Sequence, residues 1–326
     1  MPRPDEFGLI ARYFAPLTEN DPGAFDLTDD AALIRHDNRQ DLVVSTDCVV
    51  SGVHFTDDDG PDAIARKLLR VNLSDLAAMG ARPVSYVLAL ALPRQVDEAW
   101  LAGFSGGLAA DQKTYGIHLV GGDTTATGGP LVATITIFGE VPPGKMLRRN
   151  GAKVGDDLYV SGTIGDAALG LAMKLGKLKG LAAQQPDFLL KRLRYPEPRI
   201  ELGQRLREFA TSGLDVSDGL IQDAGHIADY SHVAITLELD TFPQSVEAQA
   251  CVENDAGWLR EMVTGGDDYE LLFTAPVAAA GMIASLSREL RTPITRIGHC
   301  RAGRGVTVLG KQGQPVLFER QGFRHF

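Results

Sequence analysis

Residues 42–55 read LVVSTDCVVSGVHF, an apolar run with a polar triplet in its middle. The aliphatic residues on both sides of the triplet are typical of a buried strand, whereas Ser45, Thr46 and Asp47 are not. A carboxylate without a partner inside a core costs several kcal/mol or takes up a proton. Either the run is two strands joined by a turn, or a positive group lies against Asp47.

The chain around this run has the composition of an ordinary soluble globular protein. Its 326 residues, 44% hydrophobic and 23% charged, are enough for two domains. The N-terminal stretch has no long apolar segment, and the longest apolar run, Val84–Leu92, is shorter than a membrane span. We therefore expect no signal peptide and no membrane partner. Three widely spaced cysteines, Cys48, Cys251 and Cys300, predict reduced thiols in a cytoplasmic protein, with Cys48 buried and inert.

All of the net charge of −10 lies in the first part of the chain. Residues 1–141 contain 20 acidic and 10 basic residues, and residues 142–326 contain 22 of each. This distribution argues against a basic surface that binds nucleic acid. An acidic half suits a site for cations but also favours solubility, and the positions of the acids must decide between the two.

The spacing of apolar residues predicts two domains that each mix helices and strands, an α+β (mixed α/β) fold. We assign residues 1–141 to an N-terminal domain and residues 158–326 to a C-terminal α/β domain. The segment 142–157 between them is rich in Pro, Gly and basic residues and is expected to be a linker. Strands are expected at 41–46, 84–92, 117–120, 131–138, 158–161, 233–239 and 270–274, and helices at 62–79, 98–115, 165–175, 198–211 and 221–230.

Six aspartates stand at strand ends or polar turns beside apolar runs. Carboxylate oxygens without a cluster of histidines or cysteines suit Mg²⁺, which proteins commonly share with substrate phosphates. The sequence has no GxxxxGK[ST] loop and no HRD or DFG triplet, so the site is neither a P-loop nor a protein-kinase site. The pattern therefore predicts several Mg²⁺ ions and a phosphorylated small molecule. The six residues are Asp30, Asp47, Asp75, Asp123, Asp215 and Asp218.

The aspartates also have plainer local interpretations. Asp75 shares a helical stripe with apolar residues, so it lies on the packed face or at its edge. Two glycines before Asp123 are expected to form a tight turn that presents this carboxylate at the end of a strand. Asp30 and Asp218 could instead cap a helix or a turn, and Asp57–Asp59 is expected to be a solvated loop.

A series of motifs resembles the thiamine-monophosphate kinase family, within the aminoimidazole-ribonucleotide-synthetase-like superfamily. The resemblance runs from about residue 5 to the end of the chain, with all the motifs in the family's order. The motifs are STDCVVSGVHF, NLSDLAAMGARP, GGDTT, RRNGAKVGD, DVSDGL, GGDDYELLFT and the C-terminal GFRHF.

The resemblance implies ATP-dependent phosphorylation of thiamine monophosphate to thiamine diphosphate, with Mg²⁺ as cofactor and ATP as co-substrate. It also implies a homodimer in which the N-terminal sheets pair into a barrel, with the active site between the two domains. Because the acceptor phosphate is already ionised near neutral pH, direct in-line transfer requires no general base, and we assign none.

The resemblance also implies roles for individual residues. The positions that match metal ligands are Asp30, Ser45, Thr46, Asp47, Asp75, Asp123, Asp215 and Asp218. The positions that match nucleotide contacts are Gly122, Asp123, Arg149 and Ser217, with Arg149 preferred to Arg148. The positions that match substrate contacts are His54, Asp267 and Phe323. The family often has Glu where this chain has Asp267, and Trp or Tyr where it has Phe323.

Two alternatives stay open at this point. One is another ATP-using enzyme of the same superfamily, a synthetase or dehydratase that acts through a phosphorylated carbonyl oxygen. The other is a non-catalytic protein that binds MgATP.

Overall fold

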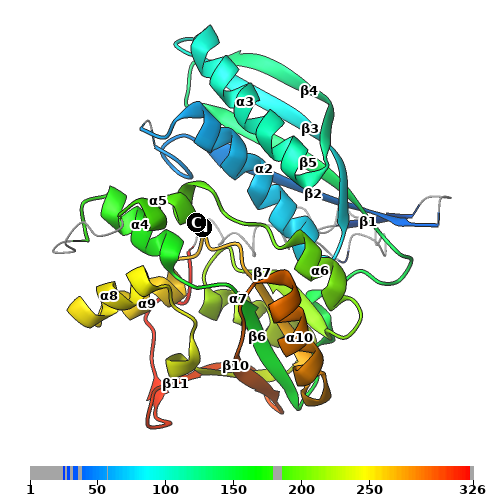
Figure 1. Ribbon diagram of the computed structural model, residues 1–326, viewed down its shortest axis with the longest axis vertical. Helices are drawn as coiled ribbons and strands as arrows, with labels where there is room; N and C mark the ends of the chain where they lie inside the picture. The colour runs from blue at the N-terminus through cyan, green and yellow to red at the C-terminus, as the bar shows by residue number, and fades with distance from the viewer. Residues whose placement is uncertain are drawn as a thin grey trace, which may run out of the picture.

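The computed structural model describes residues 25, 28–29, 32–35, 39–56, 58–178 and 186–323. Two sheets, each with helices packed against it, make up these residues, which confirms the mixed α/β class (Figure 1). The first sheet has the order β1-β2-β5-β3-β4. Its strands are β1 (Ala32–Arg35), β2 (Asp41–Val50), β3 (Arg82–Pro93), β4 (His118–Thr127) and β5 (Val132–Val141).

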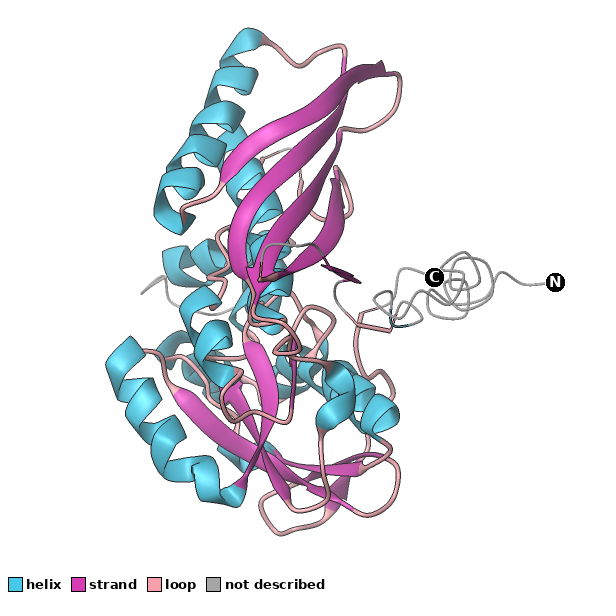
Figure 2. Cartoon of the chain, turned by 90° about the vertical axis from the view of Figure 1, so that its right-hand side faces the viewer, coloured by secondary structure: helices cyan, strands magenta, loops and turns pink. Residues whose placement is uncertain are grey.

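Two helices, α2 (Pro61–Ala78) and α3 (Glu98–Tyr115), cover one face of this sheet (Figure 2). Asp97 caps α3, because its side chain accepts a hydrogen bond from the N–H of Trp100 at 2.8 Å. Every second residue of β5 is fully buried toward the helices, including Ile135 and Ile137. The residues between them are only half-buried, because no described helix covers the opposite face.

The second sheet has the order β12-β11-β8-β10-β6-β9-β7. Its strands are β6 (Asp156–Ser161), β7 (Ser212–Asp215), β8 (Ala234–Glu238), β9 (Leu271–Pro276), β10 (Ile294–Arg301), β11 (Gly305–Leu309) and β12 (Pro315–Val316). The helices that accompany it are α4 (Asp166–Lys174), α5 (Pro186–Arg194), α6 (Ile200–Leu206), α7 (Leu220–Ser231), α8 (Val246–Asn254), α9 (Trp258–Thr264) and α10 (Ala280–Leu290).

Helix α2 joins the two parts of the chain. One apolar core includes Leu76 of α2 together with Leu202 of α6 and Phe273 of β9. The backbones of α2 and α6 touch at Gly203, where a Cβ atom would lie 2.0 Å from the carbonyl oxygen of Ala77. The two parts therefore meet through packed apolar side chains rather than through water, and α2 is held by both.

The structure overturns two expectations about strand ends. β2 continues through Asp47 to Val50, with Asp47 paired to Ile135, so the chain has no turn at the polar triplet, and the turn comes later, at residues 52–54. β4 likewise continues through Asp123, and its register against β3 shifts by one residue beside Val120. The glycines before Asp123 thus lie within a strand, next to a bulge, and do not form a tight turn.

Candidate active site

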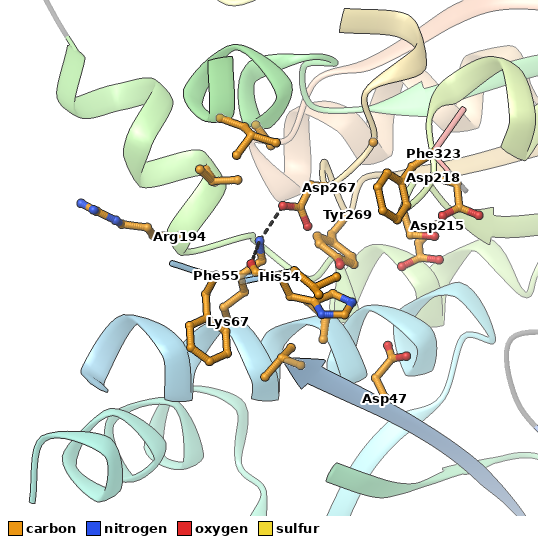
Figure 3. A pocket seen from close by; sticks show the side chains of 18 of the residues that line it. Asp47, His54, Phe55, Lys67, Arg194, Asp215, Asp218, Asp267, Tyr269 and Phe323 are labelled. Carbon is orange, nitrogen blue, oxygen red and sulfur yellow. Dashed lines mark hydrogen bonds and ion pairs between the residues drawn. The ribbon is translucent and has the colours of Figure 1, made fainter. Parts of the chain in front are cut away.

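A cavity of about 440 Å³ lies between the two parts of the chain (Figure 3). On one side it is lined by β2, the loop that follows it and α2. On the other side it is lined by α4, α5 and the loops around Ser217 and Gly266, together with Phe323. Most of the predicted site residues meet here: Ser45, Thr46, Asp47, His54, Asp75, Arg149, Ser217, Asp215, Asp218, Asp267 and Phe323 all line this cavity.

One end of the cavity is rich in carboxylates. Asp47 comes from β2, Asp75 from α2 and Asp215 from the end of β7. The Ser45 hydroxyl donates a hydrogen bond to Asp75 at 2.5 Å, and the Ser74 hydroxyl donates to Asp215 at 2.6 Å. These two hydrogen bonds orient the carboxylates of Asp75 and Asp215 relative to the helix and the strand that carry them.

The carboxylates repel one another. Burial raises the pKa of Asp75 well above its ordinary value, and the charges of Asp47 and Asp215 raise it further. Burial also raises the pKa of Asp215, although Ser74 and the nearby charge of Arg149 oppose the shift. A cluster of this kind is stable either with protons on it or with additional positive charge beside it.

Arg149 lines this end of the cavity, whereas Arg148 does not. The backbone N–H of Arg149 donates to Asp29 Oδ1 at 2.9 Å, and Arg148 Nε donates to Asp29 Oδ2 at 3.1 Å. Asp29 therefore holds the arginine pair in place and itself lines the cavity. The predicted ligand Asp30 lies outside the described residues.

The turn before α7 brings the C-terminal segment to the same end. The N–H groups of Asp218 and Gly219 donate to Asp223 Oδ2 at 3.2 and 3.0 Å, which fixes the turn. The N–H of Phe323 donates to the carbonyl oxygen of Asp218 at 2.8 Å. Figure 3 accordingly shows the Phe323 ring beside Asp218, on the carboxylate side of the cavity.

The opposite end is apolar with a basic rim. Its apolar lining includes Phe55, Ile64, Leu171 and Leu193. Lys174 and Arg194 both contact Asp59, with the Arg194 Nε to Asp59 Oδ1 distance at 2.7 Å. The side chain of Asp59 is only 8% exposed, so the expectation of a solvated acidic loop is wrong for this residue. Its role is to tie the loop after β2 to α4 and α5.

His54, Lys67 and Asp267 lie between the two ends. The ring of His54 accepts a hydrogen bond at Nδ1 from the N–H of Val50, at 3.1 Å, so the neutral ring carries its proton on Nε2. Lys67 Nζ lies 2.5 Å from Asp267 Oδ2 and 3.4 Å from the carbonyl oxygen of His54. Asp267 has a φ of 67°, a left-handed conformation that aspartate adopts more readily than most residues.

Buried ion pairs anchor the loop that carries Asp267. Glu270 is fully buried and accepts hydrogen bonds from Arg199 at 2.5 and 2.7 Å, from Arg192 at 2.8 Å and from Ser161 at 2.6 Å. Burial alone would raise the pKa of Glu270, but the two arginines outweigh it and lower this pKa.

Gly122 and Asp123 are not brought to this cavity within the chain. Both lie on β4, which is exposed along its length, and neither is among the lining residues. In the sheet, Asp47 pairs with Ile135, Ile135 with Leu88, and Leu88 with Gly122. Three strand spacings therefore separate β2 from β4, or about 14 Å. Gly122 also has a local reason to be glycine, since a Cβ atom there would lie 1.9 Å from the carbonyl oxygen of Leu88.

Sequence reasoning missed several residues that line the cavity: Asp29, Lys67, Lys174, Arg194 and Tyr269. Lys67 had a usable signal, because Lys67, Val71 and Asp75 follow one another at intervals of four and all line the cavity. Cys48 was expected to be buried, but it is exposed and lines the cavity, because it lies on the uncovered face of β2.

Two family profiles match the chain over most of its length. Residues 28–141 match "AIR synthase related protein, N-terminal domain", and residues 153–311 match "AIR synthase related protein, C-terminal domain". The thiamine-monophosphate kinase of Escherichia coli K12 is 44% identical over 322 residues, which are 98% of each chain. The chain belongs to the thiamine-monophosphate kinase family.

Solved structures of this kinase family have the same fold. The crystal structure of thiamine-monophosphate kinase from Stenotrophomonas maltophilia K279a is 42% identical, with a TM-score of 0.79, and covers 95% of this chain and 98% of its own. A structure described as AaThiL complexed with AMPPCP and TMP is 29% identical, with a TM-score of 0.87, and covers 100% of this chain and 99% of its own. The chain is accordingly an enzyme of a phosphotransferase family.

Proposed function

We propose that this protein transfers the terminal phosphoryl group of ATP to thiamine monophosphate, forming thiamine diphosphate and ADP. The observation that carries the proposal is a single cavity with two unlike ends. A carboxylate end suits phosphates neutralised by cations, and an apolar end suits the aromatic rings of the acceptor. The relative described as complexed with AMPPCP and TMP, an ATP analogue and the acceptor, supports the same pairing of ligands.

The carboxylate end fits Mg²⁺. Its candidate ligands are all hard oxygens, from Ser45, Thr46, Asp47, Asp75, Asp215 and Asp218 in the described residues, with Asp30 as a further candidate. Burial and the charges of Asp47 and Asp215 raise the pKa of Asp75, so positive charge beside these carboxylates would favour their ionised form. Mg²⁺ bound there would supply that charge and neutralise the phosphates of donor and acceptor. Three of these carboxylates have their positions set by neighbours, because Asp75 accepts from Ser45, Asp215 accepts from Ser74 and Asp218 accepts from Gln222 Nε2.

Direct in-line transfer needs no general base. An oxygen of the acceptor phosphate forms a bond to the terminal phosphorus of ATP, while the bond from that phosphorus to the bridging oxygen breaks and ADP leaves. The acceptor oxygen is already ionised near neutral pH, so no proton has to be removed. We therefore assign binding and positioning roles to the residues of the site, and no proton transfer.

Nucleotide and acceptor occupy opposite sides of the transferred group. We assign Arg149 and Ser217, at the carboxylate end, to the nucleotide. His54 and Asp267, between the two ends, are assigned to the acceptor, and His54 offers Nε2–H as a donor. Phe323 was predicted to contact the acceptor, but its ring lies beside the turn at Asp218 on the carboxylate side, and not at the apolar end that suits the acceptor rings.

We propose that the protein is a homodimer and that Gly122 and Asp123 act across it. β4 is a ten-residue strand at the edge of its sheet, with Leu119 and Val120 exposed by 44% and 56%. Long exposed edges of this kind are usually covered by another chain. Among the described strands, β1 pairs with β2 at residues 41–44, on the side of β2 away from β5. Pairing two such edges closes the sheets into a barrel and uses residues 1–141 for dimerisation.

We also propose that the reaction takes place in the cytoplasm. Cys48, Cys251 and Cys300 are all free thiols, as expected in a reducing compartment. Among the described helices, none combines the length and the apolar character needed to span a bilayer.

One experiment separates the proposed function from the alternatives. Purified protein is incubated with MgATP and thiamine monophosphate, and thiamine diphosphate and ADP are measured by chromatography. We expect both products in equal amounts and a requirement for Mg²⁺. Binding of MgATP without ADP release would indicate a non-catalytic protein. ADP release without thiamine diphosphate would indicate a synthetase or dehydratase that uses another acceptor.

A further inference from the structure

Lys67 is a nearly buried cation in the middle of the cavity that neither the family motifs nor the metal cluster accounts for. Its side chain is 8% exposed, and its Nζ contacts Asp267 Oδ2 and the carbonyl oxygen of His54. Figure 3 shows this ion pair between Arg194 and Phe55 on one side and the carboxylates on the other. Eight residues of α2, a rise of about 12 Å, separate Lys67 from Asp75. Two phosphates bound in line between them can therefore contact both.

The other cations of the cavity have different positions and partners. Among the described lining residues, these are Arg149, Lys174 and Arg194. Lys174 and Arg194 both contact Asp59 at the far rim, and Arg149 lies at the carboxylate end beside Asp29. Lys67 is thus the cation placed between the carboxylate end and the apolar end of the cavity, where the phosphate of the acceptor must lie for transfer.

We infer that Lys67 binds the phosphate of the acceptor and that Asp267 is its substitute partner when the acceptor is absent; this rests on the proposed function. A lysine with so little exposure needs an anion beside it, and Asp267 supplies one. The side chain of Asp267 is 28% exposed, so it can move away without becoming buried alone. The acceptor phosphate, with two negative charges, replaces this carboxylate at Nζ.

The replacement of Asp267 by a phosphate at Lys67 matches the charge pattern of the acceptor. Thiamine monophosphate carries a phosphate dianion and a cationic thiazolium ring in one molecule. When Lys67 turns to the phosphate, Asp267 is released for the cationic ring system. The two residues come from different parts of the chain, α2 and the loop before β9, so the acceptor joins both walls of the cavity. Lys67 and Asp267 therefore select a molecule with both charges over a simple phosphate ester.

The test compares thiamine monophosphate with thiamine, which lacks the phosphate. In Lys67→Met, we expect the KM for thiamine monophosphate to rise about 10- to 100-fold, because the variant loses one hydrogen bond between charged groups. The KM for MgATP and the Kd for thiamine should each change less than about 3-fold. Lys67→Arg should recover part of the affinity. Lys113→Met, on the exposed side of α3, is the matched control and should behave as wild type.

Two further measurements keep the result interpretable. The double variant Lys67→Met with Asp267→Asn removes both charges of the pair and is compared with Asp267→Asn alone, because Asp267 also contributes to acceptor binding. Relative to Asp267→Asn, it should lose further affinity for thiamine monophosphate and none for thiamine, which separates phosphate binding by Lys67 from loss of the ion pair. Titration calorimetry with thiamine monophosphate and with thiamine measures the role of Lys67 directly. If wild type forms no thiamine diphosphate, the proposed function fails, while calorimetry still decides on Lys67. Equal losses of affinity for both ligands, or unchanged affinity for thiamine monophosphate, would overturn the inference.

Discussion

Mixing two inactive variants should restore activity if Asp123 works in the partner's active site. The variants are Asp47→Asn and Asp123→Asn, which keep the size of the side chain and remove its charge. Each alone should lose at least about 100-fold in turnover, because a metal–phosphate contact is worth several kcal/mol. Activity in the mixture would mean that the two residues of one site come from different chains.

The expected recovery follows from the register of the sheet. Asp47 and Gly122 stand in one row across β2, β5, β3 and β4, about 14 Å apart within a chain. The proposed dimer requires β4 of one chain to approach β2 of the other, so that the second Asp123 comes near Asp47. A mixed dimer then has one site with both aspartates and one site with neither. Random association gives mixed dimers in about half of the population, so about a quarter of wild-type activity returns.

The assay uses two affinity tags on co-expressed variants, so that mixed dimers are purified through both tags. These dimers should have about half of the wild-type activity per dimer. The matched control pairs Asp47→Asn with Asp75→Asn, two residues that line the same cavity within one chain, and this mixture should stay inactive. A mixed dimer of Asp47→Asn and Asp123→Asn with no activity beyond the single variants would refute the cross-dimer assignment.

Three other predictions concern single residues. Glu270→Gln should lower the free energy of unfolding by about 3 kcal/mol in urea titration, because it removes the buried charge that Arg192 and Arg199 share. Their remaining carboxylate contacts are to Asp166 at 3.8 Å and to the exposed Glu197. Glu289→Gln, in an exposed pair with Arg205, should leave the urea midpoint unchanged. Because the pKa of Glu270 is lowered from its usual 4.5, its stabilisation should be present above pH 4.5 and lost as the pH falls through the lowered pKa. Gly203→Ala should lower the free energy of unfolding by about 1–3 kcal/mol, since the new Cβ would collide with the carbonyl oxygen of Ala77. Gly225→Ala should be neutral or stabilising, because its Cβ would lie 3.9 Å from Val306 Cγ2. His54→Ala should raise the KM for thiamine monophosphate more than the KM for MgATP in steady-state kinetics, and the reverse pattern would remove His54 from the acceptor site.

Local sequence was enough to find most of the carboxylate end. Asp75 could be placed on the packed face of α2, because helical spacing fixes which side chains share a face. The same spacing would have reached Lys67, two steps of four residues before Asp75, had it been followed along the helix. A buried lysine leaves little trace in sequence, since its partner Asp267 is 200 residues away.

The strand interpretations failed where topology decides the outcome. Asp47 lies within β2 because β5 pairs with β2 as far as Val50, and β5 lies far away in the sequence. Asp123 was expected after a turn at the end of the strand that follows α3, but it lies within that strand, β4, and its distance from Asp47 depends on the strand order β2-β5-β3-β4. Strand order is a long-range property that no local motif encodes. A match to family motifs therefore names the residues of a site without saying which chain contributes each one.

The surrounding structure opposes the mutual repulsion of the carboxylates. The charges of Asp47 and Asp215 disfavour an ionised Asp75, and separation of the two parts of the chain would relieve the repulsion from Asp215, which lies on β7. The apolar core around α2 and the backbone contact at Gly203 resist such separation. The buried pairs of Glu270 hold the opposite loop in the same way. Carboxylates that the fold keeps in place would need little rearrangement to bind the proposed cations and phosphates, so the stability lost to their repulsion would be offset by affinity for these ligands.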